Sequence, residues 1–524
     1  MSASAAPVAV FGFDAADAPL VERGLAEGWL PTLRRLAAEG GSALLDPPPS
    51  GFYNTSWIAT VTGRDVFEHR CVLDRELEPG TYRILDRHPD AIRARPFWAH
   101  LSDAGLRSTV ASIYSAPTVP GLLGTQVHGW GAIDPFTAKF GTRIFDPPET
   151  ERLLARAVPS RQQLYRTEAP TSAAGYRAYR DRLLASVEEQ TRGLAALLRE
   201  TRWDFFFGSY GEPHHGGHLL WHLADPSHDA HDPALAAAVG ETITAVYAAV
   251  DAGIGRLLEL VPTGTRCFVL TPHGMQPSYV DEPAEEILEA CGFLARRAPG
   301  SAGTAARTLD AGFRLARALV PTGVRLAIRA RLPGDGLVAE RPLAHVDWAR
   351  TRAFALPSDM TSAIRVNLAG REPQGTVGPG EYEALCDELE GLFTGLRHAA
   401  SGAPAVERVV RPAAVLGGPP RDSLPDLCVV WADTEPVRRL EVPGIGSRSV
   451  AFADPRTGQH RHVGFLTGAG PGIAAAGTPG LGTVGGSLLD VGPTMLALLG
   501  VDAPLPGRPL ERFLGGRGAG ALRS

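Results

Sequence analysis

Short, strongly apolar runs alternate with helical patterns along most of the chain. Runs such as "VAVFGF" (8–13) and "DFFFGSY" (204–210) have the composition of buried strands, whereas 30–40 and 244–261 repeat apolar residues at helical spacing. Strands that alternate with helices are typical of a largely parallel sheet covered on both faces. The sequence therefore predicts an α/β fold. Further expected strands are 108–114, 266–274, 363–368, 427–432 and 463–470.

Two regions depart from this alternation. Residues 115–200 contain loops rich in Pro and Gly followed by a charged helical stretch, and residues 296–345 are helical and rich in Arg. A chain of 524 residues can form several domains, or one large α/β domain with insertions. We interpret both regions as possible cap insertions into a single domain that spans 1–524.

Composition excludes several classes of partner. The net charge is −6, and no basic stripe with interleaved aromatic residues occurs, so nucleic acid as a bulk partner is not expected. No apolar run approaches the roughly 20 residues that a membrane span requires. The five cysteines are scattered without a CxxC pair, and the N-terminus lacks the pattern of a signal peptide. We expect a cytoplasmic protein with reduced thiols.

The stretch "YGEPHHGGHLLWH" (210–222) follows a strand-like run directly and holds four histidines. His214 and His218 are four residues apart, so on a helix they share one face and can bind one metal ion. A surface loop that happens to be polar is the alternative explanation for an isolated pair of this kind. Six of the fifteen histidines lie between 214 and 231, which favours the metal site.

Three more residues with metal-binding side chains lie at the ends of expected strands. Asp14 follows the first strand, His273 follows the run that begins at 266, and His460 precedes the run at 463–470. A lone Asp after a strand is as often a helix cap. In parallel sheets, however, ligands bind at the carboxyl ends of the strands, where Asp14 and His273 occur. Together they predict a shared metal site.

The segment "SGFYNTSWIATVTG" (50–63) places hydroxyl groups before a short apolar helix. The free N–H groups at a helix start suit a phosphate group, and Thr55 and Ser56 offer hydroxyls there. Ordinary helix capping explains the same residues equally well.

These motifs resemble those of the alkaline phosphatase superfamily, and most closely its type I phosphodiesterase/nucleotide pyrophosphatase-like branch. The opening segment with Asp14, the "TSWIATVTG" helix, the "HHGGH" segment, "LTPHGM" with His273 and "TGQHRHVGF" with His460 carry the resemblance. It extends over nearly the whole chain. The fold that it implies is a single three-layer αβα sandwich with cap insertions.

The resemblance also implies a two-metal site, with zinc as the expected cofactor. Asp14 and His273 would bind the ion on the nucleophile side, and His214, His218 and His460 would bind the other. One ion would lower the pKa of a nucleophilic hydroxyl and the other would stabilise the leaving oxygen. Asn54 would donate a hydrogen bond to the phosphoryl group.

Three departures from the family pattern bear on this site. The family's Asp in the segment that contains His273 is Pro272 here, which removes a ligand of the first ion, so one or two ions are expected. Glu212 is a possible substitute. The other site has neutral His214 in place of an Asp. The spacing to Gly63 places the nucleophile at Tyr53, whereas side-chain length favours Thr55, and both remain candidates.

The resemblance implies a metal-dependent hydrolase, a phosphodiesterase or phosphatase that acts on a small phosphorylated metabolite. Two alternatives use the same site. One is a phosphoryl transferase or phosphomutase in which an alcohol replaces water. The other is a ligand-binding homologue that has lost turnover together with the missing Asp and the usual nucleophile.

Overall fold

The computed structural model describes most of the chain, in segments separated by gaps. Tyr53, Asn54 and most of the expected insertion at 296–345 therefore lie outside the described residues. The described residues are 5–50, 55–71, 75–86, 91–92, 94–131, 143–161, 164, 169–281, 283–297, 343, 345–358, 361–418, 422–450 and 456–515.

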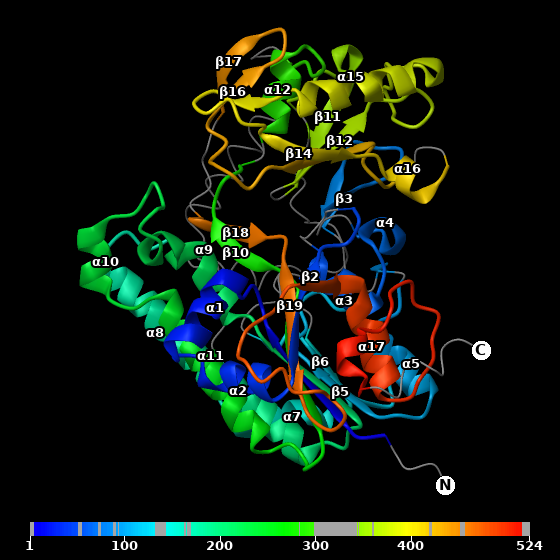
Figure 1. The fold of residues 1–524 in the computed structure, drawn as a ribbon. Helices are drawn as coiled ribbons and strands as arrows, with labels where there is room; N and C mark the ends of the chain where they lie inside the picture. The colour runs from blue at the N-terminus through cyan, green and yellow to red at the C-terminus, as the bar shows by residue number, and fades with distance from the viewer. Residues whose placement is uncertain are drawn as a thin grey trace.

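A nine-stranded, mostly parallel sheet forms the centre of the larger part of the molecule (Figure 1). Its central strands run parallel, whereas β19 and the edge strand β7 run antiparallel to their neighbours. This confirms the predicted α/β class. In sheet order the strands are β20 (Val484–Ser487), β2 (Gly41–Asp46), β19 (Gly464–Ala469), β9 (Arg266–Thr271), β1 (Val8–Phe13), β8 (Phe205–Tyr210), β5 (Ser108–Ala111), β6 (Gly124–His128) and β7 (Ile144–Asp146).

Helices cover both faces of this sheet, because successive side chains of each strand point to opposite faces. Ala9 and Phe11 of β1 belong to one hydrophobic cluster, and Val8 and Val10 belong to another on the opposite face. Figure 1 shows the two helical layers on either side of the strands. The first layer contains α1 (Ala18–Glu27), α2 (Pro31–Glu39), α7 (Glu149–Ala157), α8 (Ala173–Glu200), α9 (Glu212–Ala224), α10 (Pro233–Val239) and α11 (Ile243–Leu258), and the second contains α3 (Ser56–Thr62), α5 (Phe97–Asp103) and α17 (Val491–Leu498).

A smaller part with its own hydrophobic core lies beyond the carboxyl ends of the central strands (Figure 1). Its main sheet is antiparallel, in the order β11 (Ala353–Leu356), β12 (Thr361–Val366), β15 (Leu427–Trp431) and β14 (Val406–Val410). A three-stranded sheet is made of β13 (Arg397–His398), β16 (Arg439–Val442) and β17 (Gly446–Ser449). The helices of this part are α12 (Ala284–Ala290), α15 (Tyr382–Thr394) and α16 (Pro412–Leu416). The remaining described helix and hairpin are α4 (Val66–His69) and the pair β3 (Arg75–Leu77) and β4 (Ile84–Asp86).

The expected strands at 363–368 and 427–432 form here as β12 and β15, but they do not join the parallel sheet. An apolar run buried on both faces indicates a strand without indicating its partner, so the pattern could not separate the two sheets. Residues 115–200, considered above as a possible cap, contribute β6, β7, α7 and α8 to the main sheet and its helical layer.

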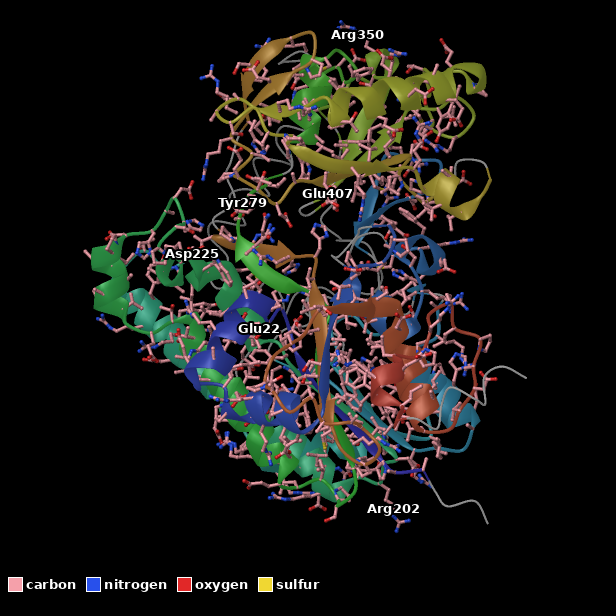
Figure 2. The ribbon with its side chains drawn as sticks, viewed as in Figure 1. Glu22, Arg202, Asp225, Tyr279, Arg350 and Glu407 are labelled. Atoms are coloured by element: carbon pink, nitrogen blue, oxygen red, sulfur yellow. The ribbon has the colours of Figure 1, made fainter. Side chains whose placement is uncertain are left out.

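A two-stranded ribbon of β10 (Gly274–Pro277) and β18 (Gly458–Arg461) lies at the junction of the two parts (Figure 1). Its register pairs Met275 with His460, which brings a residue from late in the chain beside the end of β9. Figure 2 places Tyr279 at the same junction, and its carbonyl accepts a hydrogen bond from the N–H of Val437.

One helical stretch, 233–258, is long and apolar enough to cross a membrane by length and composition alone. It is divided at Gly240 into α10 and α11. The apolar side of α11, including Val246 and Tyr247, is buried in the core against the sheet. The stretch therefore has the features of a core helix.

The buried carboxylate of Asp251 in α11 stabilises the start of α2. It accepts hydrogen bonds from the N–H groups of Thr32 (2.9 Å) and Leu33 (2.8 Å), which no residue of α2 satisfies at that end. We predict that Asp251→Ala lowers the free energy of unfolding by about 2–4 kcal/mol, because two buried donors lose their acceptor. Urea denaturation followed by circular dichroism measures the change.

Asp232→Ala is the matched control, because Asp232 caps α10 through its own exposed side chain. We expect a loss of about 1 kcal/mol there. Equal effects of the two substitutions would show that Asp251 does not link the two helices.

Candidate metal centre

Three neighbouring parallel strands, β9, β1 and β8, end at the same edge of the sheet. Asp14 directly follows β1, His273 comes two residues after β9, and α9 begins two residues after β8. The topology therefore brings residues from three distant segments to one place. This is the arrangement that the strand-end pattern of the sequence predicted.

The turn after β1 fixes Asp14. Its N–H donates to the carbonyl of Tyr210 at the end of β8 (3.0 Å). Ala15 follows with a φ of 57°, in the left-handed region, and the hydroxyl of Tyr247 donates to its carbonyl (3.2 Å). A non-glycine residue held in this region at a strand end is a feature that recurs at functional sites.

Helix α9 carries His214 and His218 on one face, as their spacing predicted. The two glycines between them allow close packing. A Cβ atom at Gly216 would lie 2.8 Å from a side-chain carbon of Ile243, and one at Gly217 would lie 2.6 Å from Met275. Larger residues would push the helix away from α11 and from the ribbon that carries His460.

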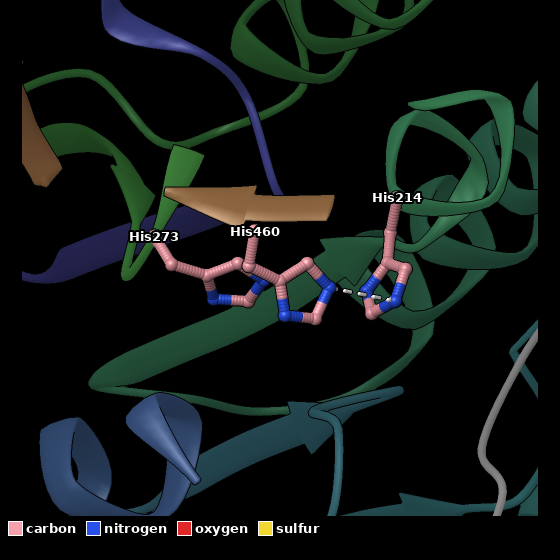
Figure 3. Close-up of side chains that lie close together, drawn as sticks. All are labelled: His214, His273 and His460. Carbon is pink, nitrogen blue, oxygen red and sulfur yellow. Dashed lines mark hydrogen bonds between the residues drawn. The ribbon is translucent and has the colours of Figure 1, made fainter. Parts of the chain in front are cut away.

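Four histidines converge at this edge (Figure 3 shows three of them). One side-chain nitrogen from each of His214, His273 and His460 lies within 4.8 Å of the other two. The Nε2 atoms of His214 and His460 are 3.2 Å apart. The ring of His218 lies 4.8 Å from that of His214 and 5.0 Å from that of His460, between centroids.

Asp14 lies next to these imidazoles and is buried, with 3% of the residue exposed. Its Oδ2 accepts from Nδ1 of His214 (3.0 Å), and its Oδ1 accepts from the indole N–H of Trp57 (2.7 Å). Nε2 of His273 is 3.7 Å from Oδ1. All five residues predicted as metal ligands thus lie together, although the grouping differs from the expected pairs, since His273 joins His214 and His460.

The Nδ1 atoms of three imidazoles have partners outside the cluster. Nδ1 of His214 bonds Asp14, Nδ1 of His218 bonds the carbonyl of Gly458 (2.7 Å), and Nδ1 of His273 bonds the hydroxyl of Ser56 (2.8 Å). Each of these bonds fixes a ring and leaves its Nε2 for another role. Histidine ligands of metal ions use hydrogen bonds of this kind.

Burial favours the neutral form of three of the clustered imidazoles, those of His218, His273 and His460. It lowers the pKa of His273 to about 4, although the neighbouring Asp14 acts in the opposite direction. It also lowers the pKa of His218 and of His460 well below the usual value, and adjacent imidazoles add to the effect. For Asp14, burial alone would raise the pKa, but His214 and His273 outweigh it, so the pKa is lowered.

These observations satisfy the requirements of a divalent cation. A metal ion binds neutral imidazoles, because a protonated ring has no free lone pair. Nε2 of His273 is buried and has no hydrogen-bond partner among the described residues. The residues present therefore fit a cation at His214, His273 and His460.

Two other candidates have different surroundings. Glu212 uses Oε1 to accept from the hydroxyl of Ser186 (2.6 Å) and lies 3.5 Å from Arg161, so it belongs to a buried ionic network at the start of α9. These contacts of Glu212 are with Ser186 and Arg161 and not with the clustered imidazoles. The buried hydroxyl of Thr55 at the start of α3 has no hydrogen-bond partner among the described residues.

Two residues of the site, Trp57 and Ser56, were not predicted from the sequence to contact the metal ligands, and Ser56 was predicted only as a hydroxyl at a helix start. Both lie in α3 and bond members of the cluster. The position of Ser56 in a hydroxyl-rich turn was a signal for it. Trp57 gave none, because a Trp in an apolar helix is ordinarily a core residue, and Trp57 is also part of the core.

Comparison with known proteins identifies the family. Residues 8–409, more than half of the chain, match the model described as type I phosphodiesterase / nucleotide pyrophosphatase. The chain belongs to this family. It is thus a phosphoester hydrolase of the alkaline phosphatase superfamily, as the resemblance predicted. His460 lies beyond the matched residues, and the structure brings it into the cluster, as its position before the strand at 463–470 predicted.

Two solved structures are similar to this phosphodiesterase family member, and the first of them supports its fold. Phosphonoacetate hydrolase from Sinorhizobium meliloti 1021, in complex with phosphonoacetate, is 14% identical with a TM-score of 0.50, over 95% of this chain and 96% of that chain. Murine ectonucleotide pyrophosphatase / phosphodiesterase 5, in complex with AMP, is 13% identical with a TM-score of 0.46, over 96% and 97%. No curated protein sequence matches the chain.

The lowered pKa of His273 predicts a pH dependence of stability in metal-free protein. Between about pH 6.5 and about 4, the ring takes up a proton in the unfolded chain but not in the folded one. Stability should therefore fall as the pH falls through this window, with His273 contributing up to about 1.4 kcal/mol per pH unit. Urea denaturation in the presence of a chelator measures the slope.

His273→Gln should show a shallower slope in that window, and the same slope as the wild type above about pH 6.5, where the ring is neutral in both states. Identical slopes between pH 4 and 6.5 would contradict the burial of a neutral imidazole at this position.

Proposed function

We propose that the protein is a divalent-cation-dependent phosphodiesterase or phosphatase that acts on a small phosphorylated metabolite, with zinc as the cation. The observation that carries this proposal is the convergence of His214, His273 and His460 above the buried carboxylate of Asp14. Nitrogen ligands favour zinc over magnesium or calcium, which prefer oxygen. A small anionic substrate is consistent with the ligand of the similar phosphonoacetate hydrolase structure, which is phosphonoacetate.

A bound cation would lower the pKa of a hydroxyl nucleophile and stabilise negative charge on the phosphoryl oxygens. The residues of this chain have separate tasks around it. Asp14, His273 and His214 are held by the hydrogen bonds described above, which keeps their geometry fixed during the reaction. Arg456 is close enough to lower the pKa of both His218 and His460, so its positive charge favours an anionic ligand at the cluster.

Thr55 is our first choice as the nucleophile. Its hydroxyl has no hydrogen-bond partner among the described residues, whereas the neighbouring hydroxyl of Ser56 is engaged by His273. Thr55 immediately precedes α3, whose first two residues, Ser56 and Trp57, bond His273 and Asp14 of the cluster. Tyr53 is the other candidate from the family spacing, and Asn54 remains the predicted donor to the phosphoryl group.

Substitution of the two candidates separates them. Thr55→Ala should lower kcat/KM for an aryl phosphodiester by about a thousandfold or more, because it removes the attacking oxygen. Tyr53→Phe should retain most of the activity. Release of nitrophenol from bis(p-nitrophenyl) phosphate measures both.

Thr62→Ala is the control, since Thr62 lies in the same helix and its hydroxyl only donates to the carbonyl of Ile58. The reverse pattern, with Tyr53→Phe inactive and Thr55→Ala active, would assign the nucleophile to Tyr53. Activity retained in both variants would exclude both hydroxyls.

Removal of the metal provides an independent test. Dialysis against a chelator should abolish hydrolysis, and zinc should restore it in the wild type but not in His460→Ala, which lacks one of the three clustered imidazoles.

A panel of phosphomonoesters, phosphodiesters and nucleotides then defines the substrate. A protein that binds zinc and nucleotides without releasing product would instead be a ligand-binding homologue, and product transferred to an added alcohol would indicate a transferase.

A further inference from the structure

The number of cations at this centre follows from the charges around it. Two divalent ions a few ångströms apart need several carboxylates to offset their mutual repulsion. The resemblance identifies two positions at which this chain lacks the family's Asp, Pro272 and His214. The carboxylate of Asp14 pairs with two imidazoles of the cluster, those of His214 and His273.

Both carboxylate oxygens of Asp14 accept hydrogen bonds from neighbouring side chains. Oδ2 accepts the hydrogen bond of His214 and Oδ1 accepts that of Trp57, at 3.0 and 2.7 Å. A carboxylate that accepts from Nδ1 of a histidine sets the tautomer of that ring and increases its basicity. Asp14 therefore has the contacts of a residue that orients a metal ligand.

The imidazoles have the spacing of ligands around one ion. In tetrahedral zinc sites with Zn–N distances of about 2.0–2.1 Å, two nitrogen ligands lie about 3.3 Å apart. The Nε2 atoms of His214 and His460 are separated by 3.2 Å. A nitrogen of His273 lies within 4.8 Å of a nitrogen of each, so small side-chain movements would complete a three-histidine site.

We propose that the centre binds a single divalent cation through the imidazoles of His214, His273 and His460, and that Asp14 orients His214 from outside the coordination sphere. This inference rests on the proposed function for the presence of a cation. It assigns to Asp14 a positioning role in place of the ligand role that the family resemblance implies. It also makes the bound cation the one metal at which an anionic substrate is held.

Metal counting on the full-length protein tests the proposal without any substrate. Purified protein is stripped with a chelator, titrated with Zn²⁺ by calorimetry, and analysed for bound zinc by mass spectrometry. The wild type should bind one ion per chain. Asp14→Asn should still bind one ion, with affinity weakened about 10- to 100-fold, because it retains the shape of the side chain but loses the charge that supports His214.

His273→Ala and His460→Ala should each weaken binding more strongly than Asp14→Asn, because each removes a ligand. His231→Ala is the control, since Nδ1 of His231 bonds only the carbonyl of His222 and the residue is outside the cluster. It should bind zinc as the wild type does. Circular dichroism of each variant shows whether it is folded.

Absorption spectra of the Co²⁺ form give a second readout, which does not depend on affinity. Saturated wild type and Asp14→Asn should have the same d–d bands if Asp14 is not a ligand. Two ions per chain, no binding, or a changed Co²⁺ spectrum in Asp14→Asn would each overturn the inference.

The outcome is separable from the proposed function. A protein that binds one zinc ion but hydrolyses no phosphate ester would contradict the function and leave the single-ion site intact. An active enzyme with two ions per chain would do the reverse.

Discussion

The hydrogen bond between Asp14 and His214 links the two ends of the centre, and the rest of the site depends on it. It joins the residue after β1 to the first turn of α9, two segments that are 200 residues apart. The parallel pairing of β1 with β8 makes this hydrogen bond possible, because both strands end at the same edge of the sheet and Asp14 and His214 follow them there. The same bond leaves Nε2 of His214 facing His460.

Two further side chains, Trp57 and His460, contact the Asp14–His214 pair from other elements of the fold. Helix α3 packs in the second hydrophobic layer through Trp57, yet the same side chain donates to Asp14, so core packing and site geometry are coupled. The ribbon of β10 and β18 brings His460 from the far end of the chain. The centre is therefore assembled from all three layers and from the junction with the smaller part.

The main strands and the grouping of the site residues could be predicted from the sequence, because both depend on local composition and on strand ends. The apolar runs identified β1, β8 and β9 closely, because strands buried on both faces have a distinctive composition, and the strand-end rule grouped Asp14, His214 and His273. The pairing of β12 with β15 in a separate antiparallel sheet depends on contacts between distant segments that periodicity does not encode. The role of Trp57 was hidden for the same reason.

The family assignment and the local chemistry lead to different expectations of the metal, and the residues explain why. Membership rests on residues 8–409 and on the fold, whereas Pro272 and His214 change the charge at the point where the cations would bind. A family defines the scaffold, but the side chains at the strand ends define what the scaffold can bind. Here they provide the three imidazoles of His214, His273 and His460, and the carboxylate of Asp14, which accepts a hydrogen bond from His214.

The most direct measurement is anomalous X-ray diffraction at the zinc absorption edge from crystals grown with zinc. The account predicts one anomalous peak, within bonding distance of a nitrogen from each of His214, His273 and His460. A peak elsewhere, or no peak near these imidazoles in zinc-saturated crystals, would contradict the central claim that they share a cation.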